Sequence, residues 1–154
     1  MQTAAQTGHY GESAVLGLLR RRGWQVTGQN VRRGRMEADL VATRLGPDGR
    51  ELLVAEVKAA QRQPRQSRQR GQPRLAGQND HDRGASVQHP QSASDLVERL
   101  SKAQRSRLWQ LAELLAAQYQ APVVRVVLIA VLLGRDRSEF LWVDLTWEEP
   151  RRYR

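Results

Sequence analysis

The chain has 154 residues, of which 25 are Lys or Arg and 16 are Asp or Glu, so its formal net charge is +9. This length predicts one domain. The lack of an apolar run of about 18 residues argues against a transmembrane helix, and the lack of cysteine excludes disulfides and thiolate zinc sites. The first residues contain no apolar core typical of a secretion signal, so we expect a cytoplasmic protein with no membrane partner. The positive charge favours a polyanionic partner, usually nucleic acid, although a GC-rich genome that favours arginine would produce the same composition.

A first helix is predicted over residues 8–22, where Val15, Leu18 and Leu19 recur at helical spacing. Gly23 follows the basic end of this segment and is a typical helix stop. The opening segment is therefore expected to pack on a core through one apolar face.

Strands are predicted after this helix. A first strand is expected over residues 24–30, a basic loop over 31–35 and a second strand over 36–44. Residues 46–50, "GPDGR", are dense in turn formers, and the Asp-Gly dipeptide is a strong hairpin signal. The stretch 50–58, "RELLVAEVK", is therefore predicted to be the second arm of a hairpin.

Residues 61–92 differ from the rest of the chain, because they are rich in Gln, Arg, Pro and Gly and contain almost no large apolar side chain. Such a segment buries too little surface to offset the entropy lost on ordering. We predict a disordered insertion within a single domain spanning residues 1–150, followed by a basic tail at 151–154. The first half of the insertion carries arginines that would attract phosphate without any neighbouring acid: Arg62, Arg65, Arg68, Arg70 and Arg74.

A long helix is predicted over residues 95–119, with Asp95 and Glu98 resembling a capping box at its start. Residues 121–134 form a nearly continuous apolar run, as expected of a strand buried on both faces, and residues 139–147 are predicted to form a last strand. The order of these elements predicts an α/β fold with one mixed β-sheet flanked by helices.

The predicted hairpin carries charges at its open end. Glu56 and Lys58 lie two residues apart and therefore share one face of the strand. If the turn is centred on residues 48–49, Asp39 pairs across from Lys58; if it is centred on 47–48, Asp39 pairs across from Glu56. In both registers the three side chains lie on the same face.

Two carboxylates this close repel each other unless a cation joins them. Mg²⁺, or Mn²⁺ in its place, prefers oxygen ligands, and one or two carboxylates with waters and a substrate phosphate complete its shell. Lys58 would then orient or help deprotonate an attacking water, or stabilise charge on the phosphate. The alternative is a solvated sheet face on which Lys58 only neutralises its neighbours.

Three motifs occur in order along the chain: "GHYGESAVLGLLRRRGW", "MEADLVA" and "LVAEVKAA". Together they resemble the YraN-like family of small bacterial proteins, which is similar to the archaeal Holliday-junction resolvases. Gly11 and Glu12 match the glycine-glutamate of that family. Residues 36–42 take the place of its G-E-I-D-L-I-A pattern, with Met36 instead of the glycine, and residues 54–58 take the place of its F-V-E-V-K pattern, with Ala55 instead of the first valine. The resemblance is closest over residues 7–59.

This resemblance implies a restriction-endonuclease-like core and a PD-(D/E)xK-type site. In such a site Asp39 and Glu56 are metal ligands, Lys58 is the catalytic lysine, and Glu12 is an additional ligand or holds a water. Basic residues on both sides of these motifs are expected to contact nucleic acid: Arg32, Arg33, Arg35, Lys102 and Arg105.

We therefore expect a Mg²⁺-dependent nuclease that hydrolyses phosphodiester bonds in branched or damaged DNA, with DNA favoured over RNA. A homodimer is expected only because resolvase-like proteins are commonly dimers. Two rivals stay open: a non-catalytic nucleic-acid-binding protein that retains the fold, and a structural protein whose charges are solvated. The intact set of Asp39, Glu56 and Lys58 favours the enzyme, and the net charge favours either nucleic-acid reading over the structural one.

Overall fold

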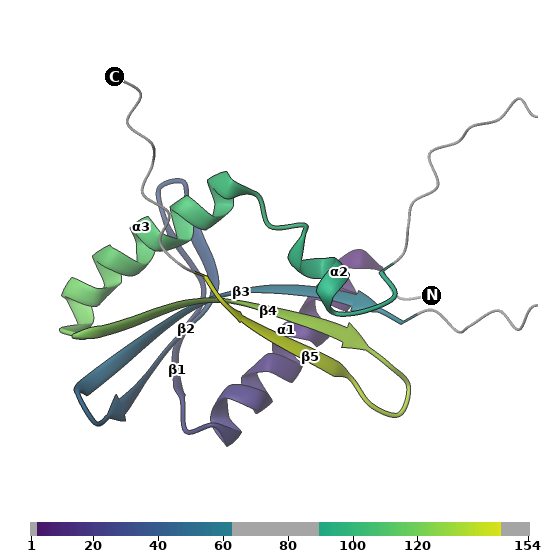
Figure 1. Ribbon diagram of the computed structural model, residues 1–154, viewed down its shortest axis with the longest axis horizontal. Coiled ribbons are helices and arrows are strands. Elements are labelled where there is room, and N and C mark those ends of the chain that lie inside the picture. Colours follow the sequence, from purple (N-terminus) through teal and green to yellow (C-terminus); the bar gives the residue numbers. More distant parts are fainter. Residues whose placement is uncertain (1–2, 63–89, 146–154) are drawn as a thin grey trace, which may run out of the picture.

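The computed structural model describes residues 3–62 and 90–145 (Figure 1). Its strands form one five-stranded sheet in the order β1-β2-β3-β4-β5, in which β3 and β4 are parallel and the other neighbours are antiparallel. The elements are α1 (Ala4–Arg21), β1 (Gln25–Arg33), β2 (Met36–Gly46), β3 (Gly49–Gln61), α2 (Ser94–Val97), α3 (Lys102–Tyr119), β4 (Val123–Leu133) and β5 (Glu139–Asp144). The predicted α/β fold with a mixed sheet flanked by helices is confirmed.

The helices cover opposite faces of the sheet (Figure 1). Val15 and Leu19 of α1 pack into the apolar cluster on one face. Leu108 and Leu111 of α3 pack into the cluster on the other face, and Leu96 of α2 extends this cover over β4. β4 therefore lies between two apolar layers, as its nearly continuous apolar sequence predicts. Within the described ranges, none of the helices combines the length and apolar character needed to span a membrane.

The first helix begins four residues earlier than predicted and ends within one residue of the predicted end. It begins earlier because Thr3 and Gln6 form a reciprocal capping box that satisfies two backbone N–H groups. At its end Gly23 adopts a φ of +79°, and the N–H of Trp24 donates to the carbonyl of Leu19. This is the glycine-terminated geometry that turns the chain directly into β1.

The two N-terminal hairpins differ from the sequence-based expectation. The predicted basic loop at 31–35 is wrong, because β1 continues through Arg33 and only Gly34 and Arg35 form the turn. Gly34 has a φ of +59°, which permits a two-residue connection. In the second hairpin Gly46 pairs with Gly49, so the turn is centred on residues 47–48, the second of the two predicted registers.

The predicted continuous helix over residues 95–119 is wrong. The chain forms the short helix α2, leaves helical geometry, and begins again at α3 after Ser101, whose φ and ψ of −72° and 157° are extended. Ser101 and Gln104 form the capping box that the sequence interpretation assigned to Asp95 and Glu98. Asp95 instead accepts hydrogen bonds from the backbone N–H groups of Ser92 and Gln91, which precede α2, and these bonds lower its pKa.

The predicted disordered insertion at 61–92 falls mainly on residues 63–89, which lie outside the described residues, as does the basic tail at 151–154. The described structure reaches into the predicted insertion from its N-terminal side. Gln61 is the last residue of β3, and Arg62 forms an ion pair with Glu139 of β5 at 2.6 Å. β5 ends at Asp144, and the last residues of the predicted strand at 139–147 are likewise outside the described ranges.

The two candidate caps make different predictions for stability. Replacing Ser101 with alanine removes the acceptor for the Gln104 N–H, so Ser101→Ala should lower the free energy of unfolding by about 1 kcal/mol. Glu98→Ala changes an exposed side chain that caps nothing and should alter stability by less than about 0.5 kcal/mol. Urea denaturation followed by circular dichroism measures both, and the reverse ranking would show that α3 is capped from Asp95 and Glu98 after all.

Candidate functional site

The candidate site lies where two neighbouring strands separate. Antiparallel pairing of β2 with β3 ends at Leu40 and Ala55. Beyond that pair β2 remains paired with β1, while β3 continues beside β4. We call this point the fork. Asp39 on β2 and Glu56 on β3 are the first residues beyond the last pair, one on each side of the fork.

The Asp39 carboxylate binds the backbone across the fork. Its Oδ2 accepts a hydrogen bond from the N–H of Val57 at 2.6 Å. A strand that loses its neighbour leaves backbone N–H groups without an acceptor, and such groups are rarely left unpaired in a folded protein. The side chain of Asp39 thus replaces the strand partner that β3 has lost, and this fixes the carboxylate beside Glu56.

Glu56 and Lys58 form an ion pair on β3, with 2.6 Å between Oε1 and Nζ. Their side chains are 14% and 25% exposed, so both groups remain in contact with solvent. Val57 and Ala59, which alternate with them, pack on the apolar cluster beneath α1. Because strand side chains alternate, Glu56 and Lys58 point to the opposite face, the one covered by α2 and α3.

The surroundings of Asp39 at the fork disfavour the ionised form of its side chain. Burial raises its pKa, the negative charges of Glu56 and Glu12 raise it further, and the result is about 7. The hydrogen bond from Val57 and the positive charge of Lys58 lower this pKa but do not outweigh the other effects. The fork therefore holds more negative charge than its single lysine neutralises.

Glu12 reaches the neighbourhood of the fork because α1 lies very close to β3. A Cβ on Gly11 would overlap the Cβ of Ala59, so only glycine allows this approach. Gly11 therefore sets the separation of helix and strand, and with it the position of Glu12, the next residue. The partly buried Glu12 carboxylate acts on Asp39 through its charge.

The acids at the fork match the ligand preference of a hard divalent cation, which takes carboxylate oxygens and completes its shell with water and phosphate. The raised pKa of Asp39 supports the fit, because a bound cation would offset both the burial and the repulsion from Glu56 that raise this pKa. Within residues 3–62 and 90–145, no three His, Cys, Asp or Glu side chains are grouped as a metal cluster. Asp39 and Glu56 are thus the candidate ligands, and the role expected of Glu12 remains a prediction.

The basic residues expected to contact nucleic acid fall into two groups. Arg33 and Arg35 are exposed at the tip of the β1–β2 hairpin, and Arg32 beside them forms an ion pair with Glu37 at 2.7 Å. This tip is the end of the strand pair that leaves β3 at the fork. It is a separate arm of the sheet, and it carries positive charge.

The second group lies on α3, which covers the face to which Glu56 and Lys58 point. Lys102 is the first residue of α3 and is exposed, whereas Arg105 is partly buried one turn later. The helix has no acidic residue in its first turn. The two groups therefore place positive charge on the separate arm and on one helix beside the sheet.

Two contacts of the site were not anticipated from the sequence. The N–H of Val57 carries no side-chain signature, so nothing in the residue pattern marks it as the partner of Asp39. The packing role of Gly11 does have a signal, because a glycine inside a helix costs about 0.5–1 kcal/mol relative to alanine and so indicates a close contact.

The close contact of α1 with β3 gives a stability prediction. Gly11→Ala should lower the free energy of unfolding by about 1–3 kcal/mol, because the new Cβ overlaps Ala59. Adding Ala59→Gly should recover most of that loss, because it removes the atom that is overlapped. The matched control is Gly8→Ala in the same helix, where no atom lies within 4 Å of the new Cβ and the change should be neutral or stabilising. Chemical denaturation of the wild type and these three variants tests this, and equal effects of Gly8→Ala and Gly11→Ala would contradict it.

The raised pKa of Asp39 gives a pH prediction. Asp39 stays protonated up to about pH 7 in the folded protein, whereas it releases its proton near pH 3.9 in the unfolded chain. Its contribution to the free energy of unfolding therefore falls as the pH rises between these two values. Asp39→Asn keeps an acceptor for Val57 but cannot ionise. Because the carboxyl is partly solvated, we expect the variant to be about 1–2 kcal/mol more stable than the wild type near pH 8 and about equal to it near pH 4. Denaturation in chelator across this range measures the difference, and a pH-independent difference would show that Asp39 ionises normally.

The motifs at the fork also appear in a comparison with known families. Residues 11–80 match the uncharacterised protein family UPF0102, a segment that contains Gly11, Glu12, Asp39, Glu56 and Lys58. No curated protein shows a significant match to the chain. This segment, just under half of the chain, is therefore similar to the uncharacterised protein family UPF0102, and the match supports the resemblance to the YraN-like family.

Proposed function

We propose that this protein is a nuclease that uses a divalent cation, Mg²⁺ or Mn²⁺, to hydrolyse phosphodiester bonds, with DNA favoured over RNA. The observation that carries the proposal is the gathering of Asp39, Glu56 and Lys58 at the fork, with the pKa of Asp39 raised to about 7. Perturbed titratable groups of this kind concentrate at functional sites. A purely structural sheet face would not require a half-buried carboxylate on which the charges of two other acids act.

Each residue has a distinct task in this proposal. Asp39 and Glu56 would hold the cation, and Val57 keeps the Asp39 carboxylate in place through its N–H. Lys58, which donates a hydrogen bond to Glu56, would orient or help deprotonate the attacking water or stabilise charge on the phosphate. When bound, the cation would polarise the phosphate and lower the pKa of water, the chemistry that hydrolysis at neutral pH requires.

The arrangement of positive charge supports nucleic acid as the substrate. The net charge is +9, and exposed arginines form the tip of the arm that leaves the sheet at the fork. Phosphate contacts from such residues would position a strand without reading its sequence. We infer a backbone-directed enzyme, for which branched or damaged DNA remains the proposed substrate class.

A second candidate function is nucleic-acid binding without catalysis. The direct ion pair between Glu56 and Lys58 favours it, because the two groups satisfy each other in the absence of any ion. A binding protein would keep the basic arm and would have no need of the acids. The two candidates therefore differ in what happens when one carboxylate at the fork is removed.

Glu56→Gln separates these candidates. If the acids hold a catalytic cation, the variant should lose cleavage by at least about 100-fold while binding DNA as tightly as the wild type, since phosphate contacts come from other residues. Mg²⁺ at about 100 times its Kd should stabilise the wild type against unfolding by about 2.7 kcal/mol and the variant by much less. The measurements are cleavage of single-stranded, duplex, flap and four-way-junction DNA, gel-shift affinity, and thermal unfolding with and without metal.

The matched control is Glu113→Gln, which removes one exposed carboxylate from α3. It should cleave DNA and respond to metal like the wild type. A wild type that binds DNA but never cleaves it with Mg²⁺ or Mn²⁺ would establish the binding protein instead. Equal cleavage by Glu56→Gln and the wild type would remove the fork as the site.

A further inference from the structure

Three arginines and two tryptophans gather on the face of the sheet that α1 covers. The guanidinium of Arg44 lies 4.2 Å from the ring centroid of Trp24, and those of Arg22 and Arg125 lie 5.3 and 5.6 Å from the ring centroid of Trp142. We call these five residues the arginine–tryptophan surface. Both tryptophans pack on the apolar cluster beneath α1, so the surface is anchored to the core.

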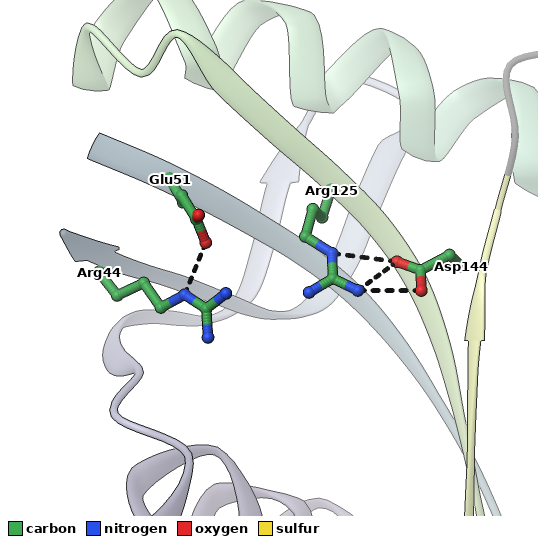
Figure 2. A network of polar contacts seen from close by, with 4 residues as sticks. All are labelled: Arg44, Glu51, Arg125 and Asp144. Carbon is green, nitrogen blue, oxygen red and sulfur yellow. Dashed lines mark hydrogen bonds and ion pairs between the residues drawn. The ribbon is translucent and has the colours of Figure 1, made fainter. Parts of the chain in front are cut away.

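Glu51 binds Arg44 and Asp144 binds Arg125, and each contact engages only part of the guanidinium group (Figure 2). Nε of Arg44 donates to Glu51 at 2.6 Å, and Nε and one terminal nitrogen of Arg125 donate to Asp144 at 3.1 and 2.8 Å. Among the described residues, both terminal nitrogens of Arg44 and the other terminal nitrogen of Arg125 have no hydrogen-bond partner. Guanidinium groups fixed in this way present N–H donors in the geometry that phosphate oxygens accept.

Positive charge exceeds negative charge here. Arg22 forms no ion pair with the described residues, and it follows two exposed arginines, Arg20 and Arg21, at the end of α1. Interaction with the helix dipole accounts for a basic helix end. It does not account for Arg44 and Arg125, which come from β2 and β4 and are 32% and 34% exposed. Charge from three elements therefore converges on one surface.

We propose that the arginine–tryptophan surface binds the phosphodiester backbone of nucleic acid at a place separate from the fork. The inference rests on the proposed function, because it takes nucleic acid as the partner. Arg44, Glu51 and Arg125 lie two positions along their strands from Ala42, Leu53 and Val127, which pack beneath α1, and so they share that face. Glu56 and Lys58 point to the opposite face. The surface and the fork therefore contact different segments of the nucleic acid.

Recognition at this surface is by phosphate and not by base stacking. Both tryptophan rings have guanidinium groups over them, and Trp24 is only 3% exposed. Phosphate contacts position a strand without carrying sequence information. The surface would thus hold a distant segment in place while the fork acts on another.

The test compares substitutions that change charge equally but at different places. Arg22→Gln removes one charge from the surface, and Arg135→Gln removes one from the exposed loop between β4 and β5. The double variant Arg125→Gln/Asp144→Asn removes an ion pair and leaves the net charge unchanged. Affinity for a labelled duplex of about two helical turns, roughly 20 base pairs, is measured across a salt series for each protein.

Arg22→Gln should weaken binding about threefold and reduce the salt slope by about one, and the neutral double variant should also weaken binding. Arg135→Gln should change affinity less than Arg22→Gln. Equal effects of Arg22→Gln and Arg135→Gln, with wild-type binding by the double variant, would show that this surface does not bind nucleic acid. That result would not affect the proposed site at the fork. Failure of the wild type to bind any DNA would overturn the proposed function as well. Circular dichroism confirms that each variant is folded.

Discussion

The separation of β2 from β3 is the constraint on which the candidate site depends. Pairing stops at Leu40 and Ala55, and the N–H of Val57 would lack an acceptor if Asp39 did not accept its hydrogen bond. That bond satisfies the backbone, and it also places a half-buried carboxylate next to Glu56. The bond between Val57 and Asp39 therefore satisfies the backbone but holds the Asp39 carboxylate in an environment that disfavours its charge. A surplus of negative charge at a branch in the sheet is the physical reason to regard the fork as functional.

The helices determine what surrounds the fork. α1 lies against β3 because Gly11 has no side chain at the contact with Ala59, and this brings the charge of Glu12 to bear on Asp39. α2 and α3 cover the other face and leave Glu56 in partial contact with solvent. The sheet thus separates two kinds of chemistry. Glu56 and Lys58 point to the face of α2 and α3, and arginines stacked on tryptophans lie on the face of α1.

Local pattern accounts for much of the fold. The alternation and turn residues of the N-terminal half predicted the β2–β3 hairpin, and the apolar run at 121–134 predicted the strand buried on both faces. The interpretation of 95–119 as one helix was wrong, since a leucine stripe continues through a break that depends on the capping bonds of Ser101. Periodicity records which residues face the core, and it does not record where the backbone leaves helical geometry. The basic loop at 31–35 was wrong for a related reason, because Gly34 allowed a tighter turn than composition suggests.

The sequence by itself determined that Glu56 and Lys58 share a face, because the two-residue period of a strand allows no other arrangement. It also narrowed the position of Asp39 to two registers, in each of which the three charges share a face. Only the tertiary structure decided between them and showed that pairing ends just before the acids meet. The bond from Val57 to Asp39, the approach of α1, and the meeting of arginines from α1, β2 and β4 were likewise beyond the sequence. Each joins residues far apart in the chain, and only the packing of the whole domain, not any local periodicity, brings such residues together.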